Sequence, residues 1–581
     1  MTETRSRTIL GASLGECVHV AGVLNFLRVA EEEGYHTVFA GPATSIPELL
    51  AAVRRERPDV VAVSYRLTPE TARSLLVELG EACSQEGLLG RDATDRPVRF
   101  IFGGTPPVAA VARDLGMFET VFSGEEPAEA VTAFLRGQRW DRMGETDFPS
   151  DLRSRIEWKA PHPILRHHFG LPARTVQPTV EGIAQIAEAQ VLDVISLGAD
   201  QDAQENFFHP ERIDPRRTGA GGVPFRDEAD LERLYAAARR GNYPLLRSYS
   251  GTDDLIRYAD VLHRTIHNAW CATSLFWFNA VDGRGPLSLR GSISDHMALM
   301  RWHGERNIPV EGNEPHHWEL RDGHDAVAVA SAYIHAFVAR AMGVHDYIAT
   351  CMFETPIQIS NRMDLSKQLA KVELVEQLTT SDFRVLRQTR TGLMSYPLDQ
   401  DAARAHLAAS VYLQMALRPH IVHVVGYCEA DHAASAQEVI SSCRMARRAI
   451  ENALRGSPDM ARDPAVQRRK EALLNDAMTI VEGIRRMGRN VSDDPLLDVE
   501  VLARAVELGL LDAPHLRGNP RACGMIRTAA RDGAIVAVDS QQHAIHEEDR
   551  VSTILLQSQG QISQSRSMAD QRPSEPRRRL Q

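Results

Sequence analysis

The stretch Thr8–Gly22, TILGASLGECVHVAG, decides the fold of the first part of the chain. An apolar run leads into a polar loop with one histidine, His19, and then into a glycine and an apolar helical pattern, VLNFLRVAEEEG. The same order repeats in the extended run Thr37–Ala40, the helix Ile46–Arg57, the buried strand DVVAVS, a further helix and the strand Val98–Phe102. This alternation predicts an α/β domain of Rossmann or flavodoxin type, a doubly wound parallel sheet that binds its ligand at the carboxyl ends of the strands.

Three loops at these strand ends read Cys17-Val-His19-Val-Ala-Gly22, Ser64-Tyr-Arg-Leu67 and Gly103-Gly104-Thr105. They resemble the Asp-x-His-x-x-Gly, Ser-x-Leu and Gly-Gly pattern of the cobalamin-binding domain of corrinoid enzymes. The resemblance implies that His19 is a ligand of the cobalt in place of the cofactor's own lower base. It implies the cofactor-binding set Cys17, His19, Gly22, Ser64, Leu67, Gly103, Gly104 and Thr105. Neutral imidazole suits such a metal, and glycines let the backbone approach a bulky ligand.

Two positions depart from the family pattern. Cys17 stands where the family has the aspartate that holds the far nitrogen of the histidine, and Leu67 comes one place late. Without that carboxylate His19 is oriented less firmly, although Glu16 could substitute for it through a shift of the loop. The alternative is a flavodoxin-like domain that binds no corrinoid.

Composition narrows the class of protein. The formal net charge of -11 over 581 residues argues against a nucleic-acid-binding protein. The N-terminal MTETRSR has no apolar segment of a signal peptide, and no apolar run has the length of a membrane span. The seven cysteines lack a CxxC pair, which is typical of a reduced cytoplasmic protein and gives no zinc or iron–sulfur signature. We therefore expect a cytoplasmic protein that binds neither membrane nor nucleic acid.

The domain boundaries follow from shifts in composition. We expect the cobalamin-type domain over residues 1–138, an interdomain connection over residues 139–177 and a second domain over residues 178–545. The connection is rich in Pro, Arg, His and Trp, and its pair His167-His168 is expected at the surface. Residues 546–581, rich in Gln, Ser and Arg, are predicted to form a disordered tail.

The second domain again alternates strands and helices. Its apolar strands are VLDVISL, PLLRSY, PLSLRG, NIPVEG, DYIATCMF, FRVLRQT and HIVHVVGY. About eight such units favour a (β/α)8 barrel of the TIM type, with a second doubly wound sheet as the alternative. Barrel chemistry lies at the carboxyl ends of the strands, which here carry Ser248-Tyr249, Arg290, Glu311, Glu354, Arg390 and Glu429.

This region is similar to the catalytic barrel of glutamate mutase, also called methylaspartate mutase. The similarity is carried by LRSYSGTDDLIRYA, LSLRGSISD, IPVEGNEP and FVARAMGVHDYIAT. In that family three arginines clamp the two substrate carboxylates and a glutamate holds the amino group. The resemblance implies that Arg290 and Arg216 are clamps, Glu311 is the amino-group partner, Tyr249 is a further substrate contact and Glu429 is a retained acid. The third arginine falls at Gly251, and a lysine that contacts the cofactor falls near Val425.

The two resemblances together imply an adenosylcobalamin-dependent radical isomerase, a carbon-skeleton mutase acting on a small amino or carboxylic acid. The residue types fit, because arginine grips a carboxylate with two donors and glutamate grips an ammonium group. Three alternatives stay open: a corrinoid-dependent methyltransferase, a non-catalytic cobalamin-binding protein, and an internal salt bridge between Arg290 and Glu311. The helix expected over Asp463–Arg489 is interpreted as one of the late helices of the barrel, and a partner subunit in a homodimer could also contact it.

Overall fold

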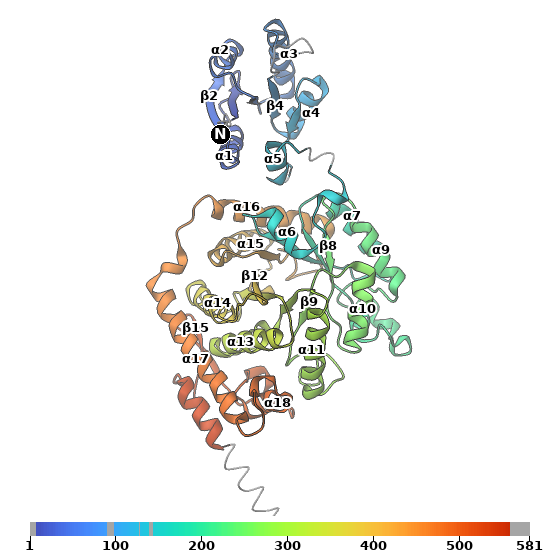
Figure 1. The fold of residues 1–581 in the computed structure, drawn as a ribbon, viewed down its shortest axis with the longest axis vertical. Coiled ribbons are helices and arrows are strands. Elements are labelled where there is room, and N and C mark those ends of the chain that lie inside the picture. The colour runs from blue at the N-terminus through green and yellow to red at the C-terminus, as the bar shows by residue number, and fades with distance from the viewer. Residues whose placement is uncertain (1–6, 90–97, 127, 139–142, 558–581) are drawn as a thin grey trace, which may run out of the picture. The chain divides into compact units, whose positions relative to one another are not determined.

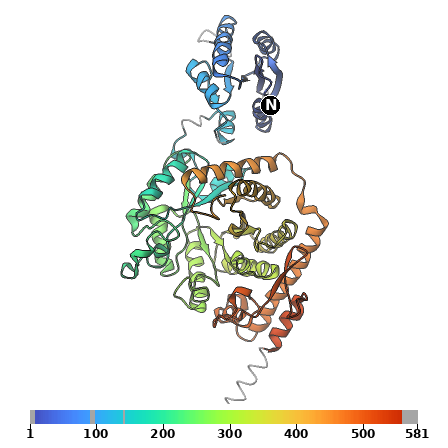
Figure 2. The same ribbon diagram turned by 180° about the vertical axis from the view of Figure 1, so that it is seen from behind.

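The computed structural model describes residues 7–89, 98–126, 128–138 and 143–557. The chain divides into two compact units, Met1–Gly144 and Glu145–Gln581 (Figures 1 and 2). Each unit is a parallel α/β structure with its own hydrophobic core.

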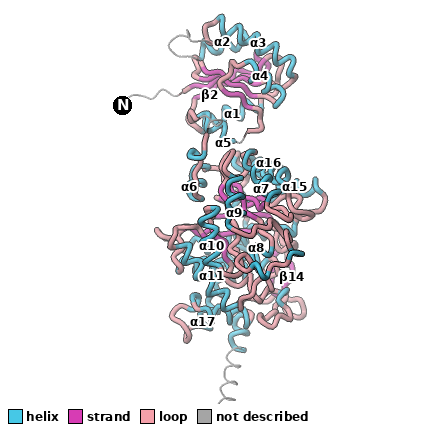
Figure 3. Tube along the Cα trace, turned by 90° about the vertical axis from the view of Figure 1, so that its right-hand side faces the viewer, coloured by secondary structure: helices cyan, strands magenta, loops and turns pink. Residues whose placement is uncertain are grey.

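The N-terminal unit is a five-stranded parallel sheet with strand order β2-β1-β3-β4-β5, which confirms the predicted doubly wound fold. The strands are β1 (Thr8–Leu14), β2 (His36–Thr44), β3 (Val60–Ser64), β4 (Arg99–Gly103) and β5 (Thr120–Phe122). The helices are α1 (Ala21–Glu32), α2 (Ile46–Glu56), α3 (Pro69–Gln85), α4 (Pro106–Leu115) and α5 (Ala128–Leu135). Helices α1 and α5 pack on one face of the sheet, and α2, α3 and α4 cover the other (Figure 3).

The C-terminal unit contains an eight-stranded parallel sheet that is nearly closed into a barrel (Figure 1). Its strands are β6 (Ile164–Phe169), β7 (Val194–Leu197), β8 (Leu245–Arg247), β9 (Cys271–Thr273), β10 (Val310–Gly312), β11 (Asp346–Phe353), β12 (Arg384–Thr391) and β13 (Ile421–Val424). They follow each other around the ring in chain order, and β13 pairs with β6. Strands β8 and β9 are the two ends of this sheet, so a seam lies between them.

The seam is bridged by two hydrogen bonds beside the strands. Ala269 N donates to Leu246 O at 2.9 Å, and Ser248 N donates to Asn268 Oδ1 at 2.8 Å. In the described part of the chain no strand ladder joins β8 to β9. This side of the wall is therefore held by fewer backbone bonds than the paired strands elsewhere.

Helices surround the barrel (Figures 1 and 2). They are α6 (Leu152–Lys159), α7 (Gln177–Glu188), α8 (Gln201–Glu205), α9 (Glu228–Ala238), α10 (Leu255–Ile266), α11 (Leu289–Gly304), α12 (Glu314–Glu319), α13 (Asp325–Ala341), α14 (Asn361–Glu376), α15 (Gln400–Gln414) and α16 (Ala436–Leu454). Packing around the strands forms two large cores. One core joins α7, α9, α10, α15 and α16, and the other joins α11, α13, α14 and the C-terminal helices α17 (Pro464–Gly488) and α18 (Val499–Leu508).

Two parts of the sequence prediction for the barrel need correction. The predicted connection, residues 139–177, contains α6 and the first barrel strand, β6, so the barrel begins before residue 178. His167 is accordingly buried inside the fold and not at the surface. The stretch PLSLRG is not a strand, because Ser288 caps the start of α11 by accepting a hydrogen bond from Gly291 N at 3.1 Å. The strand at this point of the ring is β9, formed by Cys271–Thr273.

The C-terminal region extends the barrel with α17, α18 and the antiparallel hairpin β14 (Thr528–Arg531) and β15 (Ala534–Ala537). Residues 547–557, placed in the predicted disordered tail, are helical, and Val551 packs into the core. Arg550 is buried and donates to Gly509 O at 2.6 Å and to Leu510 O at 3.0 Å. Residues 558–581 lie outside the described residues. None of the described helices is both long and apolar enough to span a membrane.

Candidate functional site

The three loops singled out in the sequence meet at one edge of the N-terminal sheet. Strand register places Ser13 beside Ser64, and Ser64 beside Gly103, at the carboxyl ends of β1, β3 and β4. After β1 the chain continues to β2, on one side, and after β3 it continues to β4, on the opposite side. The two connections therefore leave this point of the sheet in opposite directions. Such a switch point is where doubly wound sheets bind ligands.

The loop after β1 presents His19 to solvent while burying its neighbour Cys17. Ser13 Oγ donates to Cys17 O at 2.7 Å, and Ala43 N donates to the same oxygen at 3.1 Å. Cys17 Sγ lies 3.8 Å from His19 Nδ1, at the position where the sequence pattern placed an aspartate. The thiol thus contacts one ring nitrogen, and the described residues supply no hydrogen-bond partner for Nε2, the nitrogen that a metal would take.

The loops after β3 and β4 have room and an unused polar atom. Ser64 Oγ is buried and lacks a hydrogen-bond partner in the described structure. A Cβ atom at Gly103 or at Gly22 would meet no atom within 4 Å apart from those of its neighbours in the chain, so these glycines border open space. Gly104 differs, because a Cβ there would lie 2.8 Å from Tyr65 O and 2.8 Å from a ring carbon of Phe102. An unpaired hydroxyl beside open space suits the polar tail of a large cofactor.

Apolar side chains are exposed around this edge. Val18 is 63% exposed and Leu67 is 43% exposed, and Leu24 of α1 is also exposed. Thr105 precedes α4, and its side chain makes no hydrogen bond to the start of that helix. Together with His19 and the open glycines, these residues fit a corrinoid, which has a broad apolar face and polar edges.

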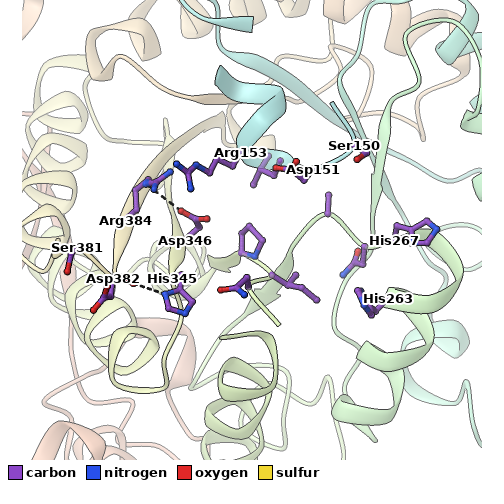
Figure 4. Close-up of a pocket in the computed structure, with 16 residues that line it drawn as sticks. Ser150, Asp151, Arg153, His263, His267, His345, Asp346, Ser381, Asp382 and Arg384 are labelled. Carbon is purple, nitrogen blue, oxygen red and sulfur yellow. Dashed lines mark hydrogen bonds and ion pairs between the residues drawn. The ribbon is translucent and has the colours of Figure 1, made fainter. Parts of the chain in front are cut away.

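The floor of the barrel is filled by apolar side chains. Ile164, Val194, Leu245, Ile348, Leu386 and Ile421, one from each of six strands, pack with Trp270 and with Leu152 of α6. Helix α6 therefore covers the amino ends of the strands. A pocket of about 510 Å³ lies at this end of the barrel, beside the start of α6, and the charged residues Asp151, Arg153, Asp346 and Arg384 are part of its lining (Figure 4). This pocket is at the end of the barrel opposite to the expected chemistry.

The next layer is a buried charged cluster centred on Glu311 of β10. Glu311 Oε2 accepts hydrogen bonds from Arg166 and Arg247, each at 2.7 Å, and from Trp270 Nε1 at 2.6 Å. Oε1 accepts from Gln388 Nε2 at 2.8 Å. Burial alone would raise the pKa of Glu311, but the two guanidinium groups outweigh it and hold that pKa well below its usual range. Two arginines thus share one carboxylate, which leaves the cluster with net positive charge.

The carboxyl ends of the strands carry a third layer of polar side chains. His168 Nε2 lies 3.0 Å from Tyr249 Oη and 3.3 Å from an Arg166 nitrogen, and its ring contacts that of His423. Burial first, and then Arg166, lowers the pKa of both histidines well below the usual range, so both rings are neutral. Arg390 follows Gln388 on the inward face of β12, because inward residues alternate along a strand. This mouth combines a cation with neutral hydrogen-bonding groups.

The structure brings together only part of the predicted substrate set. Glu311 and Tyr249 both contact the buried arginine cluster, since Arg247 also lies over the Tyr249 ring. Arg290 lies in the first turn of α11, is 40% exposed and pairs with Glu500 and Glu507 of α18. The predicted Arg290 clamp, and the alternative salt bridge to Glu311, therefore lack geometric support.

Two further predicted residues lie away from the Glu311 cluster. Arg216 is 90% exposed and pairs with Asp214 in the loop after β7. Glu429 Oε1 accepts from Gly426 N at 2.7 Å and lies 3.3 Å from His167 Nε2. We assign neither Arg216 nor Arg290 to the substrate.

The sequence prediction missed Arg166 and Arg247 as site residues. Arg247 follows two apolar residues in PLLRSY, and Arg166 lies in ILRHHF. A charged residue inside an apolar run of a parallel strand is the signal that could have identified them, because a buried charge requires a partner.

Glu314, which follows β10, gives a pH-dependent prediction. Burial raises its pKa to about 7, partly offset by hydrogen bonds from Phe276 N and Ser274 Oγ. The pKa of Glu314 is higher in the folded protein than in the unfolded chain, where it is about 4.3. The protonated carboxyl group therefore contributes its full stabilisation below about pH 4.3, and this contribution is lost as the pH rises through about 7. In the parent protein, the free energy of unfolding measured by urea titration should fall over this pH range. We expect this fall to be absent in Glu314→Gln. An equal decline in parent and variant would assign it to another group.

Comparison with known proteins bears directly on the N-terminal unit. Residues 7–132 match the family model described as the B12 binding domain. No match was found among curated protein sequences. A cobalamin-binding protein from Desulfitobacterium hafniense DCB-2 is 23% identical, with 23% of this chain and 59% of that chain covered and a TM-score of 0.20.

Other similar structures align with larger parts of the chain at low identity. Tryptophan synthase from M. tuberculosis is 14% identical, covering 52% of this chain and 98% of that chain with a TM-score of 0.30. A rubisco-like protein from Burkholderia fungorum is 13% identical, covering 57% and 73% with a TM-score of 0.32. These likenesses carry no functional argument. The family match and the geometry of the sheet edge together support cobalamin binding by residues 7–132.

Proposed function

We propose that this protein is an adenosylcobalamin-dependent radical isomerase that rearranges the carbon skeleton of a small carboxylic acid. The observation that carries the substrate class is the positively charged interior of the barrel. Within the described residues, Arg247 Nε and Nη1 are buried without hydrogen-bond partners, beside a carboxylate already shared with Arg166. Unpaired buried guanidinium nitrogens are costly, and a substrate carboxylate would satisfy them.

The chain's own residues would hold and shield the substrate. Arg247 and Arg390 would bind carboxylate oxygens, and the Tyr249 hydroxyl, held by His168, would donate or accept one further hydrogen bond. The apolar floor closes the other end of the barrel and keeps water out. Bound adenosylcobalamin would supply an organic radical by homolysis of its cobalt–carbon bond.

The state of Glu311 narrows the substrate further. Both of its oxygens already accept hydrogen bonds from Arg166, Arg247, Trp270 and Gln388. It therefore has little capacity left for the ammonium group that the resemblance assigned to it. We propose a carboxylic acid without an amino group as the substrate.

The test begins with the full-length protein, adenosylcobalamin and methylcobalamin, in the dark. We expect the adenosyl form to bind and its visible spectrum to change in a manner that His19→Ala abolishes. The loaded protein is then mixed with small carboxylic acids and with amino acids, and radical signals are recorded by electron paramagnetic resonance. Binding of the methyl form alone would favour a methyltransferase, and binding of neither would leave a non-catalytic relative.

Arg390→Gln provides a prediction for the barrel mouth. Hydrogen bonds to a charged group contribute about 1.5–3 kcal/mol, so we expect the acid that elicits the radical signal to bind roughly 10- to 100-fold more weakly. Arg390 is half-buried, and among the described residues its side chain makes one hydrogen bond, from Nε to Thr391 O at 3.3 Å, so the melting temperature should change little. Arg216→Gln, in an exposed loop, is the matched control and should leave the affinity unchanged. Equal weakening in both variants would contradict a specific role for Arg390.

A further inference from the structure

The loop after β13 and the first turn of α16 bring together a thiol, an imidazole and a carboxylate. One ligand atom each from Cys428, His432 and Glu438 lies within 4.8 Å of the other two. Cys428 is buried, Glu438 is half-buried and His432 is exposed, so the group is reachable from solvent on one side. The spacing Cys-x3-His-x5-Glu has no second cysteine, so it does not match the CxxC pattern typical of zinc sites.

Hydrogen bonds hold two of these donors from behind. His432 Nδ1 lies 2.9 Å from Asp431 Oδ2, and its Nε2 lies 2.9 Å from Glu438 Oε1. The other Glu438 oxygen, Oε2, accepts from Ser435 N at 2.8 Å and from Ser435 Oγ at 2.7 Å. A carboxylate on the far ring nitrogen is the usual arrangement behind a metal-binding histidine. His432 Nε2 and Glu438 Oε1 therefore face each other in fixed positions.

The distances leave only a small adjustment for a metal ion. A tetrahedral zinc with bonds of about 2.0–2.1 Å to nitrogen and oxygen separates these two atoms by about 3.3 Å. The present separation of 2.9 Å is bridged by a proton, which the metal would replace. Sulfur, nitrogen and carboxylate oxygen together are a donor set that zinc accepts.

We propose that Cys428, His432 and Glu438 form a Zn²⁺ site whose fourth position is open to water. Asp431 is a positioning residue in this site, because it acts through the His432 ring. The same loop carries Glu429, which is bonded to Gly426 N and lies 3.3 Å from His167. Zinc would tie this loop to α16 and fix Glu429 at the carboxyl end of the barrel. The site does not depend on the proposed isomerase function.

The test uses the full-length protein without cobalamin, stripped of metal by a chelator. We expect calorimetric titration with zinc chloride to give one equivalent of tight binding. Titration with cobalt chloride should produce a thiolate-to-cobalt charge-transfer band in the near ultraviolet. Cys428→Ser should remove that band, and His432→Gln should weaken zinc binding at least 100-fold. Asp431→Asn should weaken it about 10- to 100-fold.

The control is His209→Gln, in the second cluster of metal-type donors, formed by His209, Asp253 and Asp254. That cluster contains no thiol, so the cobalt band should be unchanged in this variant. His432 is exposed, so His432→Gln should fold normally even if the buried Cys428→Ser does not. Absence of the charge-transfer band, or zinc binding that ignores both His432→Gln and Cys428→Ser, would overturn the proposal.

Discussion

Glu311→Ala is expected to lower the unfolding free energy of the barrel by about 3–5 kcal/mol, because it leaves two buried arginines without a counter-charge. Arg166 and Arg247 donate to the same oxygen of this carboxylate, and all three side chains are almost fully buried. Urea denaturation followed by circular dichroism and tryptophan fluorescence measures the loss. The unfolding transition of the C-terminal unit, and not that of the N-terminal unit, is the one to follow.

Two companion variants separate charge from shape. Glu311→Gln keeps the volume but removes the charge, and we expect it to be destabilised less than Glu311→Ala. Arg290→Ala breaks an exposed pair with Glu500 and Glu507, and exposed pairs contribute about 0–1 kcal/mol. If Glu311→Ala and Arg290→Ala unfolded at the same urea concentration, the buried Glu311 pairs would contribute no more to the stability of the barrel than the exposed Arg290 pairs, which would contradict this prediction.

Gly103→Val is expected to weaken cobalamin binding about 10- to 100-fold while leaving the N-terminal unit folded. A Cβ at this position meets no protein atom within 4 Å apart from those of its neighbours in the chain, so the added methyl groups would enter the space beside Ser64. Overpacking costs about 1–3 kcal/mol, here as lost affinity. The measurement is equilibrium binding of adenosylcobalamin, with the melting temperature of the apoprotein as the check on folding.

The neighbouring glycine should behave in the opposite way. In Gly104→Ala the new Cβ would lie 2.8 Å from Tyr65 O, so the unit itself should lose about 1–3 kcal/mol of stability. Unchanged cobalamin affinity in Gly103→Val would mean that the cofactor's tail does not occupy this slot.

The N-terminal fold was predictable because β1, β3 and β4 are mainly apolar and its turns are marked by Gly, Pro and Ser. The barrel was harder to predict. The sequence pattern places ILRHHF, which forms strand β6, in an interdomain connection, because the stretch around it is rich in Pro, Arg, His and Trp, yet Arg166 and His167 are buried there. Arg166 pairs with Glu311, and His167 lies 3.3 Å from Glu429, and both carboxylates are far away in sequence. No local pattern shows such pairings in advance.

The candidate site divides in the same way. The loop residues of the sheet edge were predictable, because strand register alone brings Ser64 and Gly103 together. Arg290 shows the opposite case, since its motif matched a barrel strand while Ser288 starts a helix there. The motif therefore predicted a strand where the chain begins a helix, and it misplaced the Arg290 side chain.

The seam between β8 and β9 gives the barrel one side of low stiffness. The two large cores lie on either side of it, so a separation of the halves at this line would break no strand ladder. The salt bridge from Arg247 of β8 to Glu311 of β10 spans this line and holds the two sides together. A substrate carboxylate that draws Arg247 away from Glu311 would weaken this salt bridge. Binding of substrate in the interior and the width of the barrel would then be mechanically coupled.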